Sequence, residues 1–205
     1  MIKLEEISKD FKGRQVLQNF NLEIKEGEFV SIVGASGAGK TTVLNIIGLL
    51  TQPDTGNVMI KDCVNPSAKD TMKLRRYYFS YIFQNYVLMD NETVAENLRI
   101  SKKYNPDYQI STVKQTLELV CLNESFLEQK IYQLSGGEQQ RIAIARAMLK
   151  KCEVILADEP TGNLDGQNKR LVIDLFQKLK EMGKTIICVT HDEDMAKEAD
   201  RIIKI

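Results

Sequence analysis

The fold of this chain is decided by one stretch, Gly34-Ala35-Ser36-Gly37-Ala38-Gly39-Lys40-Thr41. It follows a short apolar run, Phe29–Val33, and precedes a helical pattern over Thr42–Leu50. In this strand–loop–helix context the pattern G-x-x-x-x-G-K-[ST] predicts a phosphate-binding loop (P-loop), because its glycines let backbone N–H groups face phosphate oxygens at the start of a helix. We expect Lys40 to reach the β- and γ-phosphates of a nucleotide and the Thr41 hydroxyl to bind Mg²⁺. The expected phosphate contacts come from Gly34, Ala35, Ser36, Gly37, Ala38, Gly39, Lys40, Thr41 and Thr42.

The chain contains three further short apolar runs: Tyr78–Phe83, Val154–Ala157 and Thr185–Val189. Like Phe29–Val33, they are almost continuously apolar, which is typical of parallel strands buried on both faces. Apolar residues at helical spacing lie between these runs. One set is Ile142, Ala145, Met148 and Leu149, and another is Leu171, Leu175, Leu179 and Met182. The alternation of strands and helices predicts an α/β fold with a three-layer core.

Two other parts of the chain have different patterns. From Ile2 to about Glu26, and again over Asn57–Lys61, apolar and polar residues alternate, which predicts antiparallel strands with one solvated face. Residues 85–133 contain no buried-strand run, and the spacing of Val113, Leu117, Val120 and Cys121 predicts an amphipathic helix. We therefore expect one domain, 1–205. An α/β core of the P-loop NTPase type with an antiparallel β subdomain would comprise 1–84 and 134–205, and 85–133 would form an inserted helical subdomain.

The composition limits what the protein binds. Of the 205 residues 43% are hydrophobic, and 28 Lys+Arg balance 28 Asp+Glu. A net charge of zero argues against a nucleic-acid partner, which requires many phosphate-neutralising cations. Cys121 closes a helical stripe and Cys188 lies in an apolar run, so we expect buried free thiols of a reducing cytosol. No apolar run approaches the ~20 residues of a membrane helix, so any membrane-spanning part would have to be another chain.

Polar groups follow each of the buried runs. Gln84, the pair Asp158-Glu159 and the pair Thr190-His191 stand directly after them. Ligands of an open α/β sheet bind outside the carboxyl ends of its strands, so we expect these groups to meet at the P-loop. Asp158 suits a carboxylate that holds Mg²⁺ from outside its directly bound ligands. Glu159 is placed to polarise an attacking water. The alternative is a pair of surface acids in a strand-ending turn, but a P-loop upstream favours the functional interpretation.

A second anion-binding pattern is Leu134-Ser135-Gly136-Gly137-Glu138-Gln139. Its Ser-Gly-Gly precedes a helical pattern, whose free N–H groups would form an anion site. An ordinary helix N-cap is the alternative, with Ser135 as the cap and Glu138 completing a capping box, and both interpretations can hold together. Two glycines at a helix start cost stability if capping is their only purpose, so we expect Ser135, Gly136 and Gly137 to contact a nucleotide.

On these motifs the chain resembles the ABC-transporter ATPase family over essentially its whole length, and LSGGE is that family's signature sequence. The resemblance implies that Gln84 is the Q-loop glutamine, which binds Mg²⁺ and senses the γ-phosphate. It also makes Asp165, in Asn163-Leu164-Asp165, the D-loop contact, and His191 the switch histidine that acts with Gln84 and Glu159 in catalysis. Phe11 would stack on adenine where the family more often has tyrosine, and a phenyl ring can still stack. Because the chain stops about where the family's catalytic core ends, we expect no regulatory domain.

The resemblance also implies partners. Two subunits, identical or similar, would pair head to tail so that ATP and Mg²⁺ on one P-loop are covered by the signature segment of the other. The stretch Asp158–Asp165, DEPTGNLD, resembles the branch of lipoprotein-releasing, macrolide-exporter and peptide- or bacteriocin-export ATPases. The chain would then be an exporter's ATP-hydrolysing subunit, cytoplasmic and peripheral on the inner face of the cell membrane, which powers a separate integral membrane permease. The alternative is an ABC-family ATPase that regulates a membrane partner without transporting a substrate.

Overall fold

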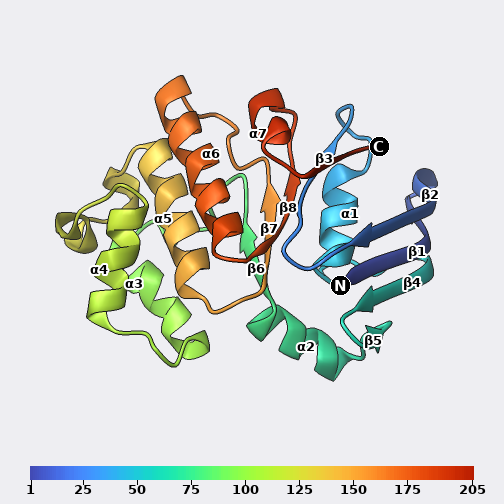
Figure 1. Cartoon of the computed structure of the whole chain (residues 1–205), viewed down its shortest axis with the longest axis horizontal. Helices are drawn as coiled ribbons and strands as arrows, with labels where there is room; N and C mark the ends of the chain where they lie inside the picture. The colour runs from blue at the N-terminus through green and yellow to red at the C-terminus, as the bar shows by residue number, and fades with distance from the viewer.

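The computed structural model describes all 205 residues and contains two β-sheets (Figure 1). The larger sheet is parallel, with the strand order β6-β7-β8-β3-β9. Its strands are β3 (Phe29–Val33), β6 (Phe79–Ile82), β7 (Val154–Asp158), β8 (Thr185–Val189) and β9 (Arg201–Lys204). All four apolar runs are thus confirmed as strands of one parallel sheet. The edge strand β9 is not predicted by the sequence pattern, because it is short and mostly exposed.

The smaller sheet is antiparallel, with the strand order β2-β1-β4-β5. It comprises β1 (Ile2–Phe11), β2 (Arg14–Ile24), β4 (Thr55–Ile60) and the short β5 (Cys63–Val64). Ile2 and Leu4 of β1 are buried, whereas Lys3 and Glu5 form an ion pair of 2.6 Å on the opposite face. The alternation of apolar and polar residues therefore marks a sheet with one buried and one solvated face, as predicted.

Alternate residues of the parallel sheet enter two separate hydrophobic cores. On one face, Ile155 and Ile186 pack in a cluster with α5 (Gly136–Leu149) and α6 (Gly166–Glu181). On the other face, Leu156 and Ile187 pack in a cluster with α1 (Lys40–Ile47) and the antiparallel sheet. Figure 1 shows α5 and α6 on one side of the parallel sheet and α1 on the other, with the antiparallel sheet beyond α1. This covering of both faces confirms the predicted α/β fold and explains the nearly continuous apolar runs.

Residues 85–133 form helices, as expected. Their elements are α3 (Val94–Arg99), α4 (Ile110–Leu119) and the 3-10 helices η1 (Ile100–Tyr104), η2 (Glu124–Glu128) and η3 (Ile131–Gln133). Leu98 of α3 and Leu117 of α4 are fully buried in the cluster that contains α5 and α6. The helical segment is therefore packed directly onto α5.

Two further helices complete the chain. Helix α2 (Ala68–Tyr77) buries none of its residues, and Figure 1 shows it at the lower edge of the molecule. Without a buried apolar stripe α2 has no signature in the sequence pattern, although the Ser67 side chain caps it by accepting the N–H of Asp70. Helix α7 (Glu193–Lys197) follows β8. No helix of the molecule combines the length and the apolar character needed to cross a membrane.

Two expectations about burial are wrong. Cys121 is exposed because α4 ends at Leu119 and the chain turns away, with a φ of 58° at Cys121 itself. Met182 is 55% exposed because it is the C-cap of α6, where the chain leaves the helix. The buried stripe of α6 is formed instead by Val172, Ile173, Leu175, Phe176 and Leu179.

Candidate functional site

The glycine-rich loop joins the end of β3 to the start of α1, and two of its glycines are required by the backbone. Gly37 and Gly39 have φ values of 77° and 98°, in the left-handed region that other residues rarely adopt. A Cβ on Gly39 would also stand only 2.9 Å from Cγ1 of Val16, on the β1–β2 hairpin. The loop therefore owes its shape to glycine and to close contact with the hairpin.

The start of α1 is open to an anion. Its N-cap is Gly39, which has no side chain to bond the first-turn N–H groups, and the first turn carries no acidic residue. Free N–H groups and the helix dipole together favour a negatively charged ligand at this place. Lys40 Nζ donates to the carbonyl oxygens of Gly34 at 2.9 Å and Ala35 at 3.0 Å, so its ammonium lies against the loop. The loop thus offers backbone donors and one cation to a phosphate.

Thr41 and Asp158 come from different elements and meet beside the loop. The Thr41 hydroxyl donates to Asp158 Oδ1 at 3.1 Å. Burial raises the pKa of Asp158, the Thr41 hydrogen bond opposes this, and the nearby Glu159 charge adds to it. Mg²⁺ is commonly held by one or two carboxylates, with water and substrate phosphates completing its shell. A partly buried carboxylate next to a hydroxyl therefore fits Mg²⁺, and no group of three or more His, Cys, Asp or Glu side chains forms another metal cage.

Glu159 and His191 form a pair at the ends of β7 and β8. His191 Nδ1 lies 2.9 Å from Glu159 Oε2, and the His191 backbone N–H donates to the same oxygen at 3.2 Å. Glu159 has a φ of 47°, a strained value for a residue with a side chain, and its N–H donates to the Val189 carbonyl at 2.8 Å. The carboxylate is only 14% exposed, whereas the histidine ring is 72% exposed. These contacts fix the Glu159 carboxylate directly after β7, next to Asp158.

Gln84 meets the loop that follows Glu159. Its Nε2 lies 3.4 Å from the place where a Cβ would stand on Gly162, and the Gly162 N–H donates to the Glu159 carbonyl at 3.0 Å. The structure thus brings Gln84 together with Asp158, Glu159 and His191 at the carboxyl ends of β6, β7 and β8. This is the arrangement that the order of strands and polar groups predicts.

Ser135 is the N-cap of α5, and both halves of a capping box are present. The Ser135 hydroxyl accepts the Glu138 N–H at 3.4 Å, and the Glu138 carboxylate accepts the Ser135 N–H at 2.8 Å. The capping interpretation is therefore confirmed, and Ser135 and Gly136 are both exposed at this turn. In Figure 1 the start of α5 and the start of α1 stand apart, with α6 and α7 between them.

The start of α5 is joined to the start of α6 through Asn168. A Cβ on Gly137 would overlap the Asn168 side chain. Asp165, the N-cap of α6, accepts the Asn168 backbone N–H at 2.9 Å and the Asn168 side-chain amide at 2.8 Å. The guanidinium of Arg141, which is 8% exposed, donates to Asn168 Oδ1. Arg141 and Asn168 escape sequence reasoning because neither is part of a recognised motif.

Comparison with known proteins assigns this geometry to a family. The family model described as ABC transporter matches residues 17–162. The chain belongs to the ABC transporter family. It is 42% identical over 213 residues to the macrolide export ATP-binding/permease protein of Vibrio parahaemolyticus, with 100% of this chain and 33% of that protein covered. The chain thus spans about a third of the length of the macrolide exporters that it matches.

Other relatives match this ABC cassette over nearly their whole length. An uncharacterized ABC transporter ATP-binding protein of Methanocaldococcus jannaschii is 42% identical over 216 residues, with 99% of this chain and 92% of that protein covered. A dimeric structure of that cassette in a post-hydrolysis state, bound to ADP and Pi, has a TM-score of 0.90 at 39% identity and covers 100% of this chain and 94% of its own. The expected family, the expected branch, which includes the macrolide exporters, and the cassette fold are confirmed.

The hairpin of this ABC cassette presents Phe11 to solvent. Phe11 is 48% exposed as a residue, and Lys9 Nζ lies 5.4 Å from the centroid of its ring. Lys9 in turn forms an ion pair of 2.6 Å with Asp54. An exposed ring on the hairpin that packs against the P-loop is free to stack on a base. The adenine contact of Phe11 stays a prediction.

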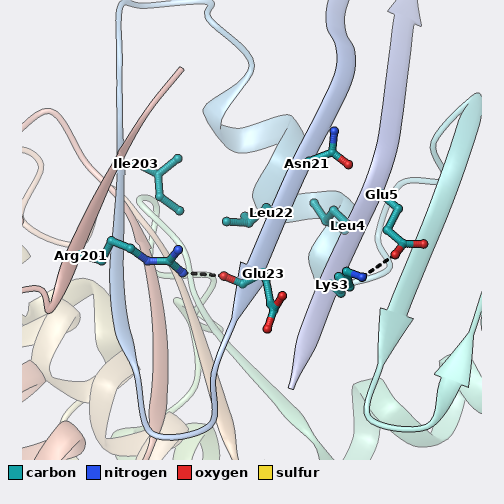
Figure 2. Close-up of a pocket in the computed structure, with 8 residues that line it drawn as sticks. All are labelled: Lys3, Leu4, Glu5, Asn21, Leu22, Glu23, Arg201 and Ile203. Atoms are coloured by element: carbon teal, nitrogen blue, oxygen red, sulfur yellow. Dashed lines mark hydrogen bonds and ion pairs between the residues drawn. The ribbon is translucent and has the colours of Figure 1, made fainter.

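A groove on another side of the ABC cassette is not a comparable site (Figure 2). It is lined by Lys3, Leu4, Glu5, Asn21, Leu22, Glu23, Arg201 and Ile203. Both of its cations already have partners, since Lys3 pairs with Glu5 at 2.6 Å and Arg201 pairs with Glu28 at 2.8 Å. The groove therefore has no free cation for a phosphate, in contrast to the loop at the start of α1.

Proposed function

We propose that this chain binds and hydrolyses ATP, and that the ATPase powers a membrane permease as part of an ABC transporter. One observation carries the proposal. The open start of α1 with Lys40, the Thr41–Asp158 pair and the Glu159–His191 pair lie together at one edge of the parallel sheet. Phosphoryl transfer needs a phosphate, a divalent cation and an attacking water to be held in one place, and positioning supplies most of the catalysis.

The role of each residue follows from its place. Lys40 and the backbone N–H groups of the loop bind the β- and γ-phosphates, while Thr41 and Asp158 hold Mg²⁺. Mg²⁺, when bound, offsets negative charge on the phosphate oxygens. Glu159 orients the attacking water and accepts its proton, and His191 keeps the Glu159 carboxylate in position. Gln84, which lies against the loop that follows Glu159, links the site to residues 85–133.

The signature turn, Ser135–Gly137, serves the nucleotide of a second subunit. The nearest side chains around Gly136 and Gly137 are Tyr86 and Asn168, neither of which belongs to the P-loop. The turn and the start of α1 stand apart in the chain (Figure 1), and the related archaeal cassette forms a dimer. Asp165 caps α6 next to this turn, so both motifs would lie on the surface that meets the partner.

The permease and the direction of transport rest on similarity. The Vibrio parahaemolyticus relative carries ATP-binding and permease functions in one macrolide export protein. On this basis we infer a cassette on the cytoplasmic face of the cell membrane that drives export of a drug, peptide, bacteriocin or lipoprotein. Measuring substrate translocation by the reconstituted complex would distinguish export from regulation of a membrane partner.

Glu159→Gln is the direct test of the proposed activity. The variant keeps the shape of the side chain but loses the base, so we expect MgATP binding near that of the wild type and hydrolysis slower by roughly 100-fold or more. Calorimetry and phosphate release would measure the two quantities. Lys40→Ala is the matched control, because it should weaken binding itself. Near-normal turnover of Glu159→Gln would remove Glu159 from the role of base, and unchanged ATP affinity in Lys40→Ala would contradict the assigned phosphate site.

A further inference from the structure

The β1–β2 hairpin brings a second cation to the tip of the P-loop. A terminal guanidinium nitrogen of Arg14 lies 3.5 Å from the place where a Cβ would stand on Gly37. Arg14 is fixed on one side by its pairing with Phe11 across the hairpin turn. On the other side the hairpin rests on the loop, because Val16 and Leu17 approach a Cβ on Gly39 to 2.9 Å and 3.2 Å. The placement of Arg14 over the loop therefore follows from strand pairing and from packing.

Arg14 has no acidic partner within the chain. It takes part in none of the ion pairs of the molecule. The nearby cation Lys9 is different, since it is paired with Asp54 at 2.6 Å. A guanidinium without a carboxylate is available to an anion, and its fork of donors matches phosphate oxygens.

The charges of the site favour a second cation. Lys40 contributes one positive charge beside the loop, whereas Asp158 and Glu159 contribute two carboxylates. Mg²⁺, when bound, would offset these carboxylates, which leaves Lys40 as the one positive side chain among them to face a strongly negative nucleotide. Arg14 adds a second positive side chain at the loop. The Arg14 backbone pairs with Phe11, the predicted adenine contact, while its guanidinium stands beside Gly37 of the P-loop.

We propose that Arg14 binds the phosphate groups of the nucleotide from the hairpin side of the P-loop. The inference rests on the proposed nucleotide site. Because the guanidinium contacts phosphate before the reaction and during it alike, it contributes uniform binding. Its loss therefore raises KM and leaves kcat nearly unchanged, which separates Arg14 from the residues that act on the water.

The test compares Arg14→Gln with the wild type by calorimetry with ATP and with ADP, and by steady-state ATPase kinetics. Losing one charge-assisted hydrogen bond to phosphate should weaken the binding of both nucleotides by roughly 10-fold. It should raise KM for ATP by a similar factor. The difference in nucleotide affinity between Arg14→Gln and the wild type should shrink when the salt concentration is raised, because the contact is solvent-accessible. Wild-type affinity for ATP and ADP in Arg14→Gln, with the fold intact by thermal unfolding, would overturn the inference.

Three further variants make the result specific. Lys12→Gln removes the same charge from the same turn and should change affinity by less than about 2-fold, since an exposed charge that does not touch the phosphate is largely screened. A loss equal to that of Arg14→Gln would show a general field effect and overturn the contact. Arg14→Lys keeps the charge but not the fork of donors, so its affinity should lie between those of the wild type and Arg14→Gln. A loss as large as that of Arg14→Gln would contradict the electrostatic argument. Lys40→Ala reports on the site itself. If it weakens binding and Arg14→Gln does not, the inference on Arg14 fails alone, and if neither does, the proposed nucleotide site fails.

Discussion

At the scale of single residues, Gly137 shows that packing within the same chain can require a glycine of the signature motif. A Cβ there would overlap Asn168, which is held in place by Arg141 and by the cap of α6 at Asp165. Asn168 cannot move aside without breaking these hydrogen bonds. Gly166, at the start of α6, has nothing within 4 Å of a Cβ. One glycine is therefore demanded by packing and the other is not.

Gly137→Ala should consequently destabilise the protein by about 1–3 kcal/mol, the usual range for overpacking a tight site. Gly166→Ala should stay within about 0.5 kcal/mol of the wild type, as surface substitutions do. Urea unfolding would measure both variants. Equal stabilities of the two variants would mean that Asn168 does not fill the space beside Gly137.

Asp158 makes stability depend on pH in the nucleotide-free protein. Burial holds its folded-state pKa above the ordinary value, so the ionised form is disfavoured in the folded chain. The destabilisation is present above the folded pKa and disappears as pH falls below the unfolded pKa. Asp158→Asn should therefore be more stable than the wild type at about pH 7, and the gain should diminish toward about pH 4, near the ordinary aspartate pKa. A gain in urea-unfolding free energy that stays constant between these pH values would contradict this assignment.

At the scale of elements, burial determined what could be predicted. Strands β3 and β8 coincide with apolar runs because both of their faces are covered. Helix α2 and strand β9 bury little or nothing, so no apolar period marks them. Met182 illustrates a different limit. It continues the 3.6-residue spacing of α6 in the sequence, but spacing does not show where a helix ends, and the last position falls in solvent.

The corrected stripe of α6 can be tested by paired truncations. Leu179 is fully buried in the cluster shared with α5, so Leu179→Ala should cost about 2–5 kcal/mol through lost burial and a cavity. Met182→Ala should change stability by less than about 0.5 kcal/mol, because the side chain is mostly in water. Chemical denaturation of both variants would decide. Similar losses would place Met182 in the core after all.

At the scale of the whole molecule, parallel topology explains why much of the site was predictable. Parallel strands end at one edge, so Gln84, Asp158, Glu159 and His191 could be placed together from the order of motifs. Arg14, by contrast, reaches the P-loop because the β1–β2 hairpin of one sheet packs against the loop that follows β3 of the other sheet. No periodicity or motif encodes such a contact. The same holds for the contact of Asn168 with Gly137.

Ser135→Arg tests the proposed sharing of sites between subunits. The substitution should leave ATP binding to the monomer intact and abolish ATP-driven pairing and turnover, because it alters the turn that would cover the partner's nucleotide. A mixed dimer of one Ser135→Arg chain and one Lys40→Ala chain would carry both lesions at one composite site and none at the other. Hydrolysis by the mixture, with both homodimers inactive, is the expected result. Loss of ATP binding in a folded Ser135→Arg monomer would instead show that the turn serves its own nucleotide.

Helix α2 has one more consequence, which concerns limited proteolysis. It buries no residue and carries the basic residues Lys69, Lys73, Arg75 and Arg76, so a helix that opens locally offers trypsin its first cleavage sites. A cut there would leave two fragments, one with β3 and the other with β8 and β9. Because β3 lies between β8 and β9 in the parallel sheet, the carboxyl-terminal fragment would pair with β3 of the amino-terminal fragment on both sides. The nicked chain should therefore stay assembled, and its two halves, produced separately, should reconstitute the protein by complementation.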